Sequence, residues 1–247
     1  MNKRERDLSA GNNLEVLGYT SAPEATALID TLDPKSRLEM ASVYQQAFAG
    51  YPWYEVVACK QCGEFAKEGD TCSHCQGTVF AEAYPTEWLL KEYLPQMVAD
   101  YVPGVLILAK DETDSIQGFS CGGGIKLGEL IEHKYKGKPD ILESITTNSE
   151  VNPEKTVFYE NETCISPTVQ QKGMGSQLNF ARVKQASELG FEHVCGRTIN
   201  LPWLEVKKRH FAQFGYDCAA FYPEGDTYEV DGQRRFFFMA TKRNGEN

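Results

Sequence analysis

The stretch Val169–Leu178, VQQKGMGSQL, sets the strongest constraint on the fold. Two glycines, Gly173 and Gly175, flank a single residue, and a helical pattern of apolar residues follows them. A glycine turn that leads into a helix is typical of phosphate-binding sites, because the first helical turn presents unpaired N–H groups and a partial positive charge. We therefore expect a phosphate group here, and the spacing of the glycines indicates which kind.

Two familiar phosphate-binding motifs do not match this stretch. A dinucleotide fingerprint needs a third glycine three residues after the second, and that position is Leu178. A P-loop needs widely spaced glycines followed by Lys-Ser or Lys-Thr, and neither feature is present. The pattern Q/R-x-x-G-x-G/A fits in full at Gln170, Gly173 and Gly175. The stretch therefore argues against a dinucleotide and a nucleoside triphosphate.

The rest of the chain alternates strand-like and helix-like segments. Runs rich in β-formers predict strands at 13–20, 156–166 and 191–199, a hairpin within 104–125, and a terminal antiparallel pair at 216–225 and 234–243. Apolar residues at spacings of three and four predict helices at 34–48, 86–101, 176–189 and 204–214. Strands that are partly consecutive, with helices between them, predict an α+β fold.

Two local features modify this pattern. Pro95 lies inside the second predicted helix and is expected to kink or split it. Three glycines, 122–124, interrupt the second strand of the predicted hairpin. Glycines inside a strand often mark a bulge or a close approach of another backbone segment.

Together with the glycine turn, this pattern resembles the GNAT superfamily of acyl-CoA N-acyltransferases. The run TCISPTVQQKGMGSQL, residues 163–178, matches the family's fourth strand, its Pro-containing turn and the helix that follows. FGY at Phe214–Tyr216 lies where the family carries a helix-ending LGF, and AFAGYPWYE, residues 47–55, resembles the aromatic loop after its first helix. The resemblance implies one domain over 1–247, with a mixed sheet splayed between its fourth and fifth strands. Two insertions interrupt it: 58–77, which holds four cysteines, and 126–155, a polar surface segment in which a short helix is expected at Leu127–Tyr135.

The resemblance implies acetyl-CoA as the cosubstrate. In the family the glycine loop grips the coenzyme pyrophosphate, and glycines let it approach the main chain without a Cβ clash. The residues that would form this loop are Gln170, Gln171, Lys172, Gly173, Met174, Gly175 and Ser176. The family's splayed fourth strand pairs with the pantetheine arm, a role that falls to Thr163, Cys164 and Ile165. The alternative interpretation is that the glycines merely form a tight strand–helix turn.

Two carboxylates are candidates for the general base of acyl transfer to an amine. Glu160 and Glu162 lie on the strand that enters the coenzyme site, and in a regular strand they share a face with each other and with Cys164. A solvated strand edge is the alternative interpretation of both. The family attacks directly, without an acyl-enzyme, so Cys164 is not expected to be a nucleophile. His193 and His210 are interpreted as structural.

One position departs from the family pattern. Many members place a tyrosine four residues before the helix-ending glycine, as the acid for the leaving thiolate, and here that residue is Phe211. Tyr216, Tyr159 or water could replace it. The sequence therefore predicts an N-acetyltransferase that moves an acetyl group to a primary amine. The alternative is an acyl-CoA sensor or partner-docking module with little turnover.

Four of the eight cysteines form two close pairs, Cys59-x-x-Cys62 and Cys72-x-x-Cys75. This spacing is typical of a four-thiolate zinc site built from two knuckles. Disulfides, or an iron site of similar geometry, are the alternatives. Because all four positions would be filled by protein ligands, we expect the zinc to be structural.

The four-cysteine insertion falls between the family's first two helices, a region that usually borders the acceptor site. We hypothesise that it shapes acceptor binding or docks a partner. Nucleic-acid binding is not expected, because the segment contains only two cationic residues, Lys60 and Lys67. They are outnumbered by three acidic residues, Glu64, Glu68 and Asp70.

Composition adds weak constraints. The 247 residues are 41% hydrophobic and 24% charged, and the formal net charge of −10 argues against broad nucleic-acid binding. The N-terminal residues show no secretory signal and the apolar runs are too short to span a membrane, so we expect a cytoplasmic protein. The acceptor is expected to be a small-molecule or protein amine. A homodimer is one option for assembly, which the sequence does not determine.

Overall fold

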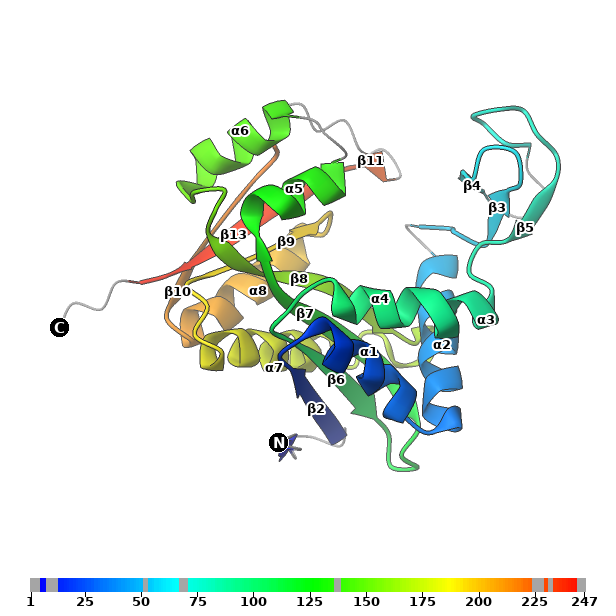
Figure 1. Ribbon diagram of the computed structural model, residues 1–247, viewed down its shortest axis with the longest axis horizontal. Coiled ribbons are helices and arrows are strands. Elements are labelled where there is room, and N and C mark those ends of the chain that lie inside the picture. The colour runs from blue at the N-terminus through cyan, green and yellow to red at the C-terminus, as the bar shows by residue number, and fades with distance from the viewer. Residues whose placement is uncertain are drawn as a thin grey trace.

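The computed structural model describes residues 5–7, 13–50, 53–66, 71–135, 139–223, 229–230 and 233–243. Within these residues, eight strands form a central sheet in the order β1-β2-β6-β7-β8-β9-β13-β10 (Figure 1). Their bounds are β1 Glu5–Asp7, β2 Asn13–Tyr19, β6 Gly104–Lys110, β7 Ile116–Lys126, β8 Thr156–Ile165, β9 His193–Thr198, β10 Tyr216–Phe221 and β13 Phe236–Lys242. All neighbouring pairs are antiparallel except β8 and β9, which run parallel. The predicted mixed sheet is confirmed.

Helices cover both faces of this sheet. On one face, α1 (Ala22–Thr31), α2 (Pro34–Ala49) and α4 (Leu94–Ala99) pack over the first half of the sheet, and α5 (Leu127–Tyr135) and α6 (Pro139–Ser149) pack over the second half. Helices α7 (Met174–Glu188) and α8 (Leu201–Gln213) cover the opposite face. Strand β6 shows the alternation directly, since Leu106 and Leu108 face the first layer while Val105 and Ile107 face the second.

Helix α1 was not expected from the sequence. Its N-cap is Ser21, whose side chain accepts a hydrogen bond from the amide of Glu24, and Glu24 in turn accepts one from the amide of Thr20. This arrangement is a variant of the capping box, in which the carboxylate of Glu24 accepts from the residue before the N-cap instead of from the N-cap itself. Leu28 and Ile29 bury the inner face of the helix. Only one residue, Leu32, separates the end of α1 from Asp33, the N-cap of α2, so the two helices follow each other directly.

The helix predicted at 86–101 is split where Pro95 lies. It consists of α3 (Thr86–Trp88), a π-helical turn at Leu89–Tyr93, and α4. Proline cannot donate the amide hydrogen bond of a regular helix, and a π-turn is one way in which the ladder accommodates that loss. The predicted disturbance of the helix by Pro95 is confirmed. The helix begins at Thr86, and its N-cap, Pro85, makes no side-chain hydrogen bond.

The insertion at 126–155 is more deeply buried than its polar sequence indicates. The predicted short helix at Leu127–Tyr135 is present as α5, and α6 follows it, with 136–138 outside the described residues. Ile141 and Ile145 of α6 are fully buried in a cluster with Phe237 and Met239 of β13. The two helices therefore form part of the layer over β8, β9 and β13, rather than a surface segment alone.

The four-cysteine segment forms a separate small sheet in the order β4-β3-β5, set off to one side of the main sheet in Figure 1. Its strands are β3 Val57–Cys59, β4 Phe65–Ala66 and β5 Phe80–Glu82, so the unit extends on both sides of the predicted range 58–77. Residues 51–52 of the predicted aromatic loop and 67–70 of this segment lie outside the described residues. A further two-stranded pair, β11 (Glu229–Val230) with β12 (Gln233–Arg234), precedes β13.

Among the described helices, none has both the length and the apolar character that crossing a membrane requires.

Candidate active site

The central sheet opens between β8 and β9. The two strands pair only at Phe158–Val194 and Tyr159–Cys195, near their beginnings. The backbone of residues 160–165 has no ladder partner on the β9 side among the described residues, as the resemblance implies for the fourth strand. The predicted splay is therefore confirmed.

A cavity of about 650 Å³ lies at this opening. Because the strands separate there, residues of both helical layers reach it. Its walls come from the end of α2 and the loop after it, from β8, from α7, from the end of β9, from the first half of α8, and from the residue before β13. The lining residues are Phe48, Trp53, Tyr159, Glu160, Asn161, Glu162, Thr163, Arg182, Arg197, Thr198, Ile199, Asn200, Leu201, Pro202, Trp203, Lys207 and Arg235.

A β-bulge separates the two predicted carboxylates. Gly122 of β7 faces Glu160 and Cys121 faces Glu162, so Asn161 is an extra residue in β8. The inserted residue shifts the alternation by one, and Glu160 and Glu162 point to opposite faces of the sheet. The expectation that they share a face is wrong, because it assumed a regular strand. The glycines at 122–124 do mark both a bulge and a close approach, since a Cβ at Gly122 would meet the carbonyl oxygen of Tyr159 at 2.5 Å.

Glu160 lies on the α7/α8 face in a buried ionic cluster. Its carboxylate is 3.1 Å from the guanidinium of Arg182 and also pairs with the ammonium of Lys207. The side chains of Glu160, Arg182 and Lys207 are 1%, 2% and 5% exposed, respectively. Burial raises the pKa of Glu160, but the charges of Arg182 and Lys207 outweigh it and leave that pKa below its ordinary value. Glu160 is thus an ionised carboxylate held by two cations, which makes it a poor proton acceptor.

Arg182 also binds the bulge itself. Its Nη1 donates to the carbonyl oxygen of Cys121 at 3.1 Å and to that of Glu162 at 2.7 Å. One guanidinium therefore satisfies the Glu160 carboxylate and two backbone oxygens that the disrupted ladder leaves unpaired. We interpret Arg182 as the residue that maintains the geometry of the bulge.

The ionic cluster continues to the start of α7. Lys207 donates to the Oδ1 of Asn179 at 2.6 Å, and the Nδ2 of Asn179 lies 3.0 Å from the Nδ1 of His210. The Nε2 of His210 lies 3.2 Å from the hydroxyl of Ser176. Since the Nδ2 of Asn179 can only donate, the neutral ring of His210 carries its proton on Nε2. Burial lowers the pKa of His210, consistent with a neutral ring and a structural role.

Glu162 occupies a different environment on the α2/α5 face. Its side chain is half-buried and lines the cavity, and within the described part of the chain it makes no ion pair. Burial raises the pKa of Glu162, and the charges of Lys134, Arg235 and Arg197 offset only part of the shift. A carboxyl group with a raised pKa, open to a cavity, can accept a proton. Of the two predicted carboxylates, Glu162 has the properties of a general base.

The predicted pyrophosphate loop, 170–176, leads into the beginning of α7, on the face opposite to Glu162. The helix begins at Met174, two residues earlier than predicted, with Gly173 as its N-cap. Gly173 has φ +85°, a left-handed conformation that glycine adopts without strain, and a Cβ there would meet no heavy atom within 4 Å. A Cβ at Gly175, by contrast, would meet the Cδ1 of Ile165 at 2.9 Å. The turn therefore favours glycine at 173, and Gly175 allows α7 to pack closely against Ile165 of β8.

The side chains of this segment differ in accessibility. Gln170, Gln171, Lys172 and Gly173 are exposed, and Gly175 and Ser176 are half-buried. Met174 packs in the core, so only its amide can face a ligand. Cys164 is also fully buried, and burial raises the pKa of its thiol well above the usual value, which argues against a nucleophilic role. Thr163 is the member of the predicted pantetheine group that lines the cavity.

The structure distinguishes between Tyr216 and Tyr159, the two tyrosines that could replace the acid missing at Phe211. Phe211 is fully buried, between the rings of Tyr216 and Phe238. The hydroxyl of Tyr216 donates to the backbone oxygen of Phe191 within the core, away from the cavity. Tyr159 lines the cavity.

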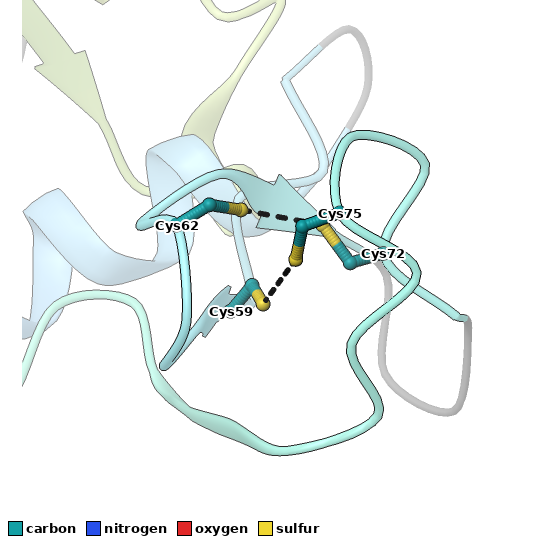
Figure 2. A group of neighbouring side chains, drawn as sticks. All are labelled: Cys59, Cys62, Cys72 and Cys75. Carbon is teal, nitrogen blue, oxygen red and sulfur yellow. Dashed lines mark hydrogen bonds between the residues drawn. The ribbon is translucent and has the colours of Figure 1, made fainter.

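The four cysteines of the small sheet meet in one cluster, shown in Figure 2. Their Sγ atoms all lie within 4.8 Å of one another, and the pairs Cys59–Cys75 and Cys62–Cys72 are 3.5 Å apart. A tetrahedral zinc ion with Zn–S bonds of about 2.3 Å separates its sulfur ligands by about 3.8 Å. The cluster therefore fits a tetrahedral four-thiolate metal site.

The two knuckles repeat the same backbone geometry. The amide of Cys59 donates to the carbonyl of Glu64 and that of Cys72 to the carbonyl of Gly77, both at 2.9 Å. Gly63 and Gln76, each four residues after the first cysteine of its knuckle, have positive φ. A Cβ at Gly77 would meet two cysteine sulfurs at 3.2 Å. The backbone of the two knuckles therefore folds closely around the cysteine sulfur atoms.

Aromatic contacts connect the small sheet to the cavity. Phe65 of β4 lies 5.4 Å from Tyr84, ring centre to ring centre, and the hydroxyl of Tyr84 donates to the carboxylate of Glu55. Phe48, which lines the cavity, lies 5.8 Å from Tyr84 and 5.6 Å from Trp53. The position of the small sheet therefore influences the cavity wall on the Glu162 face.

Sequence reasoning missed most of the charged residues around the cavity. Arg182 follows Leu178 by four residues and Lys207 follows Leu204 by three, so both lie on the apolar faces of their helices. A charge on an apolar face was an available signal that these residues have a buried partner. Arg235 directly precedes the strand FFFMATK and gave no such signal.

Comparison with known proteins identifies the fold. No protein-family model and no curated protein sequence matches the chain. A solved structure from Corynebacterium glutamicum, described as histone acetyltransferase HPA2 and related acetyltransferase, covers 87% of this chain and 96% of its own at 15% identity, with a TM-score of 0.50. A Desulfovibrio desulfuricans protein assigned to the GNAT family covers 92% and 98% at 13% identity, with a TM-score of 0.43. A Drosophila melanogaster polyamine N-acetyltransferase covers 92% and 100% at 13% identity, with a TM-score of 0.41.

Proposed function

We propose that this chain, which has the fold of the GNAT acetyltransferases, transfers an acetyl group from acetyl-CoA to a primary amine. The observation that carries the proposal is the position of Glu162. This half-buried carboxyl group with a raised pKa faces a cavity of about 650 Å³, where β8 presents a backbone edge without a strand partner. Acyl transfer from a long thioester requires a group that accepts a proton and a strand edge that can pair with the extended arm of the donor.

The donor is proposed to bind from the α7 side. The amides of Gln171–Ser176 surround the N-terminus of α7, where the helix dipole favours the pyrophosphate. The pantetheine arm pairs with the free edge of β8 at Thr163, Cys164 and Ile165, and the side chain of Thr163 borders the thioester. In this arrangement the donor and the proposed base approach the opening of the sheet from opposite faces.

The chemical step uses direct attack. Glu162 accepts a proton from the amine, whose nitrogen then forms a bond to the thioester carbonyl carbon. The C–S bond breaks, and coenzyme A leaves as a thiolate that takes a proton from Tyr159 or from water. Glu160 takes no part in this proton transfer, because Arg182 and Lys207 hold it in the ionised form.

The four-cysteine cluster is proposed to hold a structural zinc ion. Cys59, Cys62, Cys72 and Cys75 would fill its four positions, so that no site is open for substrate. Through Phe65 and Tyr84 the metal would fix the cavity wall formed by Phe48 and Trp53. The acceptor side of the cavity would then depend on the metal, whereas the donor side would not.

A thiol-release assay with acetyl-CoA and a panel of amines tests the proposed function. We expect turnover with at least one amine, and loss of acetyl-CoA binding in Gly173→Asp, which places a carboxylate beside the proposed pyrophosphate. Ser187→Asp, on the same helix but distant from the turn, is the matched control. Tight acetyl-CoA binding without turnover on any amine would instead indicate an acyl-CoA sensor. Unchanged binding in Gly173→Asp would contradict the donor site.

A further inference from the structure

The hydrogen bonds that connect the buried ionic cluster to the start of α7 all run in one direction. The ammonium of Lys207 can only donate, so the Oδ1 of Asn179, 2.6 Å away, accepts from it. The amide nitrogen of Asn179 is then left to donate to the Nδ1 of His210 at 3.0 Å. The neutral ring of His210 therefore has its single N–H at Nε2, 3.2 Å from the hydroxyl oxygen of Ser176.

The hydroxyl group of Ser176 is the last member of this series. Because it accepts from the Nε2–H of His210, its own hydrogen takes no part in that contact and points elsewhere. Ser176 is half-buried and is the third residue of α7, after Met174 and Gly175. The N–H groups of these first helical residues have no acceptor within the helix. The hydroxyl therefore adds an oriented donor to a turn whose amides already favour an anion.

The inner members of the series are shielded from solvent. Asn179, Lys207 and His210 are all buried. The ring of Phe180 packs edge-on against that of His210, with the ring centres 5.5 Å apart. A buried amide or imidazole that reversed its orientation would lose hydrogen bonds for which water is no substitute. The direction of the series is therefore fixed by the fold.

We propose that His210 is a positioning residue for the donor, because its Nε2–H holds the oxygen of Ser176 and turns the hydroxyl hydrogen toward the pyrophosphate of acetyl-CoA. This inference rests on the donor site of the proposed function. Ser176 contacts the phosphate, and His210 acts only through Ser176. The buried cluster on the Glu160 face then has a second role, since Lys207 and Asn179 determine which nitrogen of His210 carries the proton.

Calorimetric titration with two donors tests the contact of Ser176. S-acetylpantetheine has the thioester arm of acetyl-CoA but lacks the pyrophosphate. Ser176→Ala should raise Kd for acetyl-CoA about 10- to 100-fold, the range for a hydrogen bond to a charged group, and leave Kd for S-acetylpantetheine nearly unchanged. Ser187→Ala is the matched control, because Ser187 is a half-buried serine near the other end of α7 that accepts from Lys242 at 2.8 Å.

Two substitutions at His210 separate positioning from packing. In His210→Gln the side-chain amide nitrogen can replace Nε2 and donate to Ser176, whereas the shorter amide of His210→Asn reaches only the position of Nδ1, beside Asn179. We expect His210→Gln to keep the affinity for acetyl-CoA and His210→Asn to lose about as much as Ser176→Ala. In the Ser176→Ala background, His210→Asn should cause no further loss. The affinity for S-acetylpantetheine reports whether each variant is folded.

The outcomes separate this inference from the proposed function. An unchanged affinity for acetyl-CoA in Ser176→Ala contradicts the hydroxyl contact. Equal losses in His210→Gln and His210→Asn, or a further loss when His210→Asn is added to Ser176→Ala, contradict the positioning role. These results leave the acetyltransferase function intact. The expected pattern of affinities without turnover on any amine contradicts the proposed transfer alone, and a wild-type protein that does not bind acetyl-CoA contradicts both.

Discussion

The two faces of the central sheet differ most where β8 carries its bulge. On the α7/α8 face, Glu160 is buried, ionised and held by two cations. Two residues later along the same strand, on the other face, Glu162 is half-buried, has a raised pKa and opens into the cavity. The same side-chain type therefore has two roles. Glu160 stabilises the strand geometry, and Glu162 is available for chemistry.

One inserted residue produces this division. In a regular strand, residues two apart such as Glu160 and Glu162 would share one face, whereas the bulge at Asn161 places them opposite the adjacent residues Gly122 and Cys121 and therefore on opposite faces. The bulge turns Glu162 toward the α2/α5 face, and Arg182 binds the backbone oxygens that the bulge exposes. Arg182 supports the bulge from the Glu160 face, and Asn161 itself donates to the backbone oxygen of Met97 in α4 on the other face.

The largest expected effect comes from removing that support. Arg182→Met should lower the free energy of unfolding by about 3–5 kcal/mol, because it leaves Glu160 with one cation and two backbone oxygens without a partner. Urea denaturation measures the change. Arg209→Met makes the same chemical change on the exposed surface of α8. It should change the free energy of unfolding by no more than about 0.5 kcal/mol. Equal losses in the two variants would show that the bulge does not depend on Arg182.

The two glutamates should respond in opposite ways to the same isosteric change. Glu160→Gln should cost about 3 kcal/mol at neutral pH, because it leaves two buried cations without their anion. Glu162→Gln should change stability by less than about 0.5 kcal/mol, or stabilise the protein, because it removes a carboxylate that burial disfavours. Denaturation of both variants beside the wild type measures this difference.

The contributions of Glu160 and Glu162 to the free energy of unfolding should change with pH in opposite directions. The pKa of Glu160 is lowered by folding, so its contribution is present above the ordinary pKa and is lost as the pH falls through the folded value. The pKa of Glu162 is raised, so its contribution is present at low pH and is lost as the pH rises through the folded value. Parallel pH trends for the two variants would contradict the division between the faces.

A smaller effect is expected from the metal. Removing zinc by a chelator, or through Cys72→Ser, should raise KM for the acceptor about three- to tenfold, since the aromatic contacts through Tyr84 are worth about 0.5–1.5 kcal/mol. The affinity for acetyl-CoA should remain nearly unchanged, because its proposed site lies on the other face. Cys218→Ser, outside the cluster, is the control. A collapse of acetyl-CoA binding with the metal would instead make the small sheet a support of the whole fold.

Much of the architecture could be predicted from local patterns. The helix at Pro34–Ala49, the broken helix around Pro95, the hairpin of β6 and β7 and the terminal pair follow from caps, prolines and periodicity. The splay between β8 and β9 was predicted from the resemblance, because nothing in the amino-acid sequence of either strand specifies where their pairing ends. The four-cysteine cluster was predictable, since its ligands are close in sequence.

The arrangement of the site was harder to predict because it depends on contacts between distant residues. The bulge adds a single residue to β8, which leaves the β-pattern of 156–166 unchanged in the sequence. Arg197 and Arg235 meet the cavity from β9 and from the start of β13. Their relation to Glu162 exists only after the sheet has formed. The expected shared face of Glu160 and Glu162 failed for this reason.

The pH dependence of kcat at saturating acetyl-CoA and acceptor tests the central claim most directly, because it reports groups in the enzyme–substrate complex. The wild type should show a rise in kcat with an apparent pKa above the ordinary glutamate value, because Glu162 must be ionised to accept the proton. Glu162→Gln should lose that rise and about 10²–10⁴-fold in rate, whereas Glu160→Gln should retain the rise. A Glu162→Gln enzyme that keeps both the wild-type rise and the wild-type rate would contradict the account.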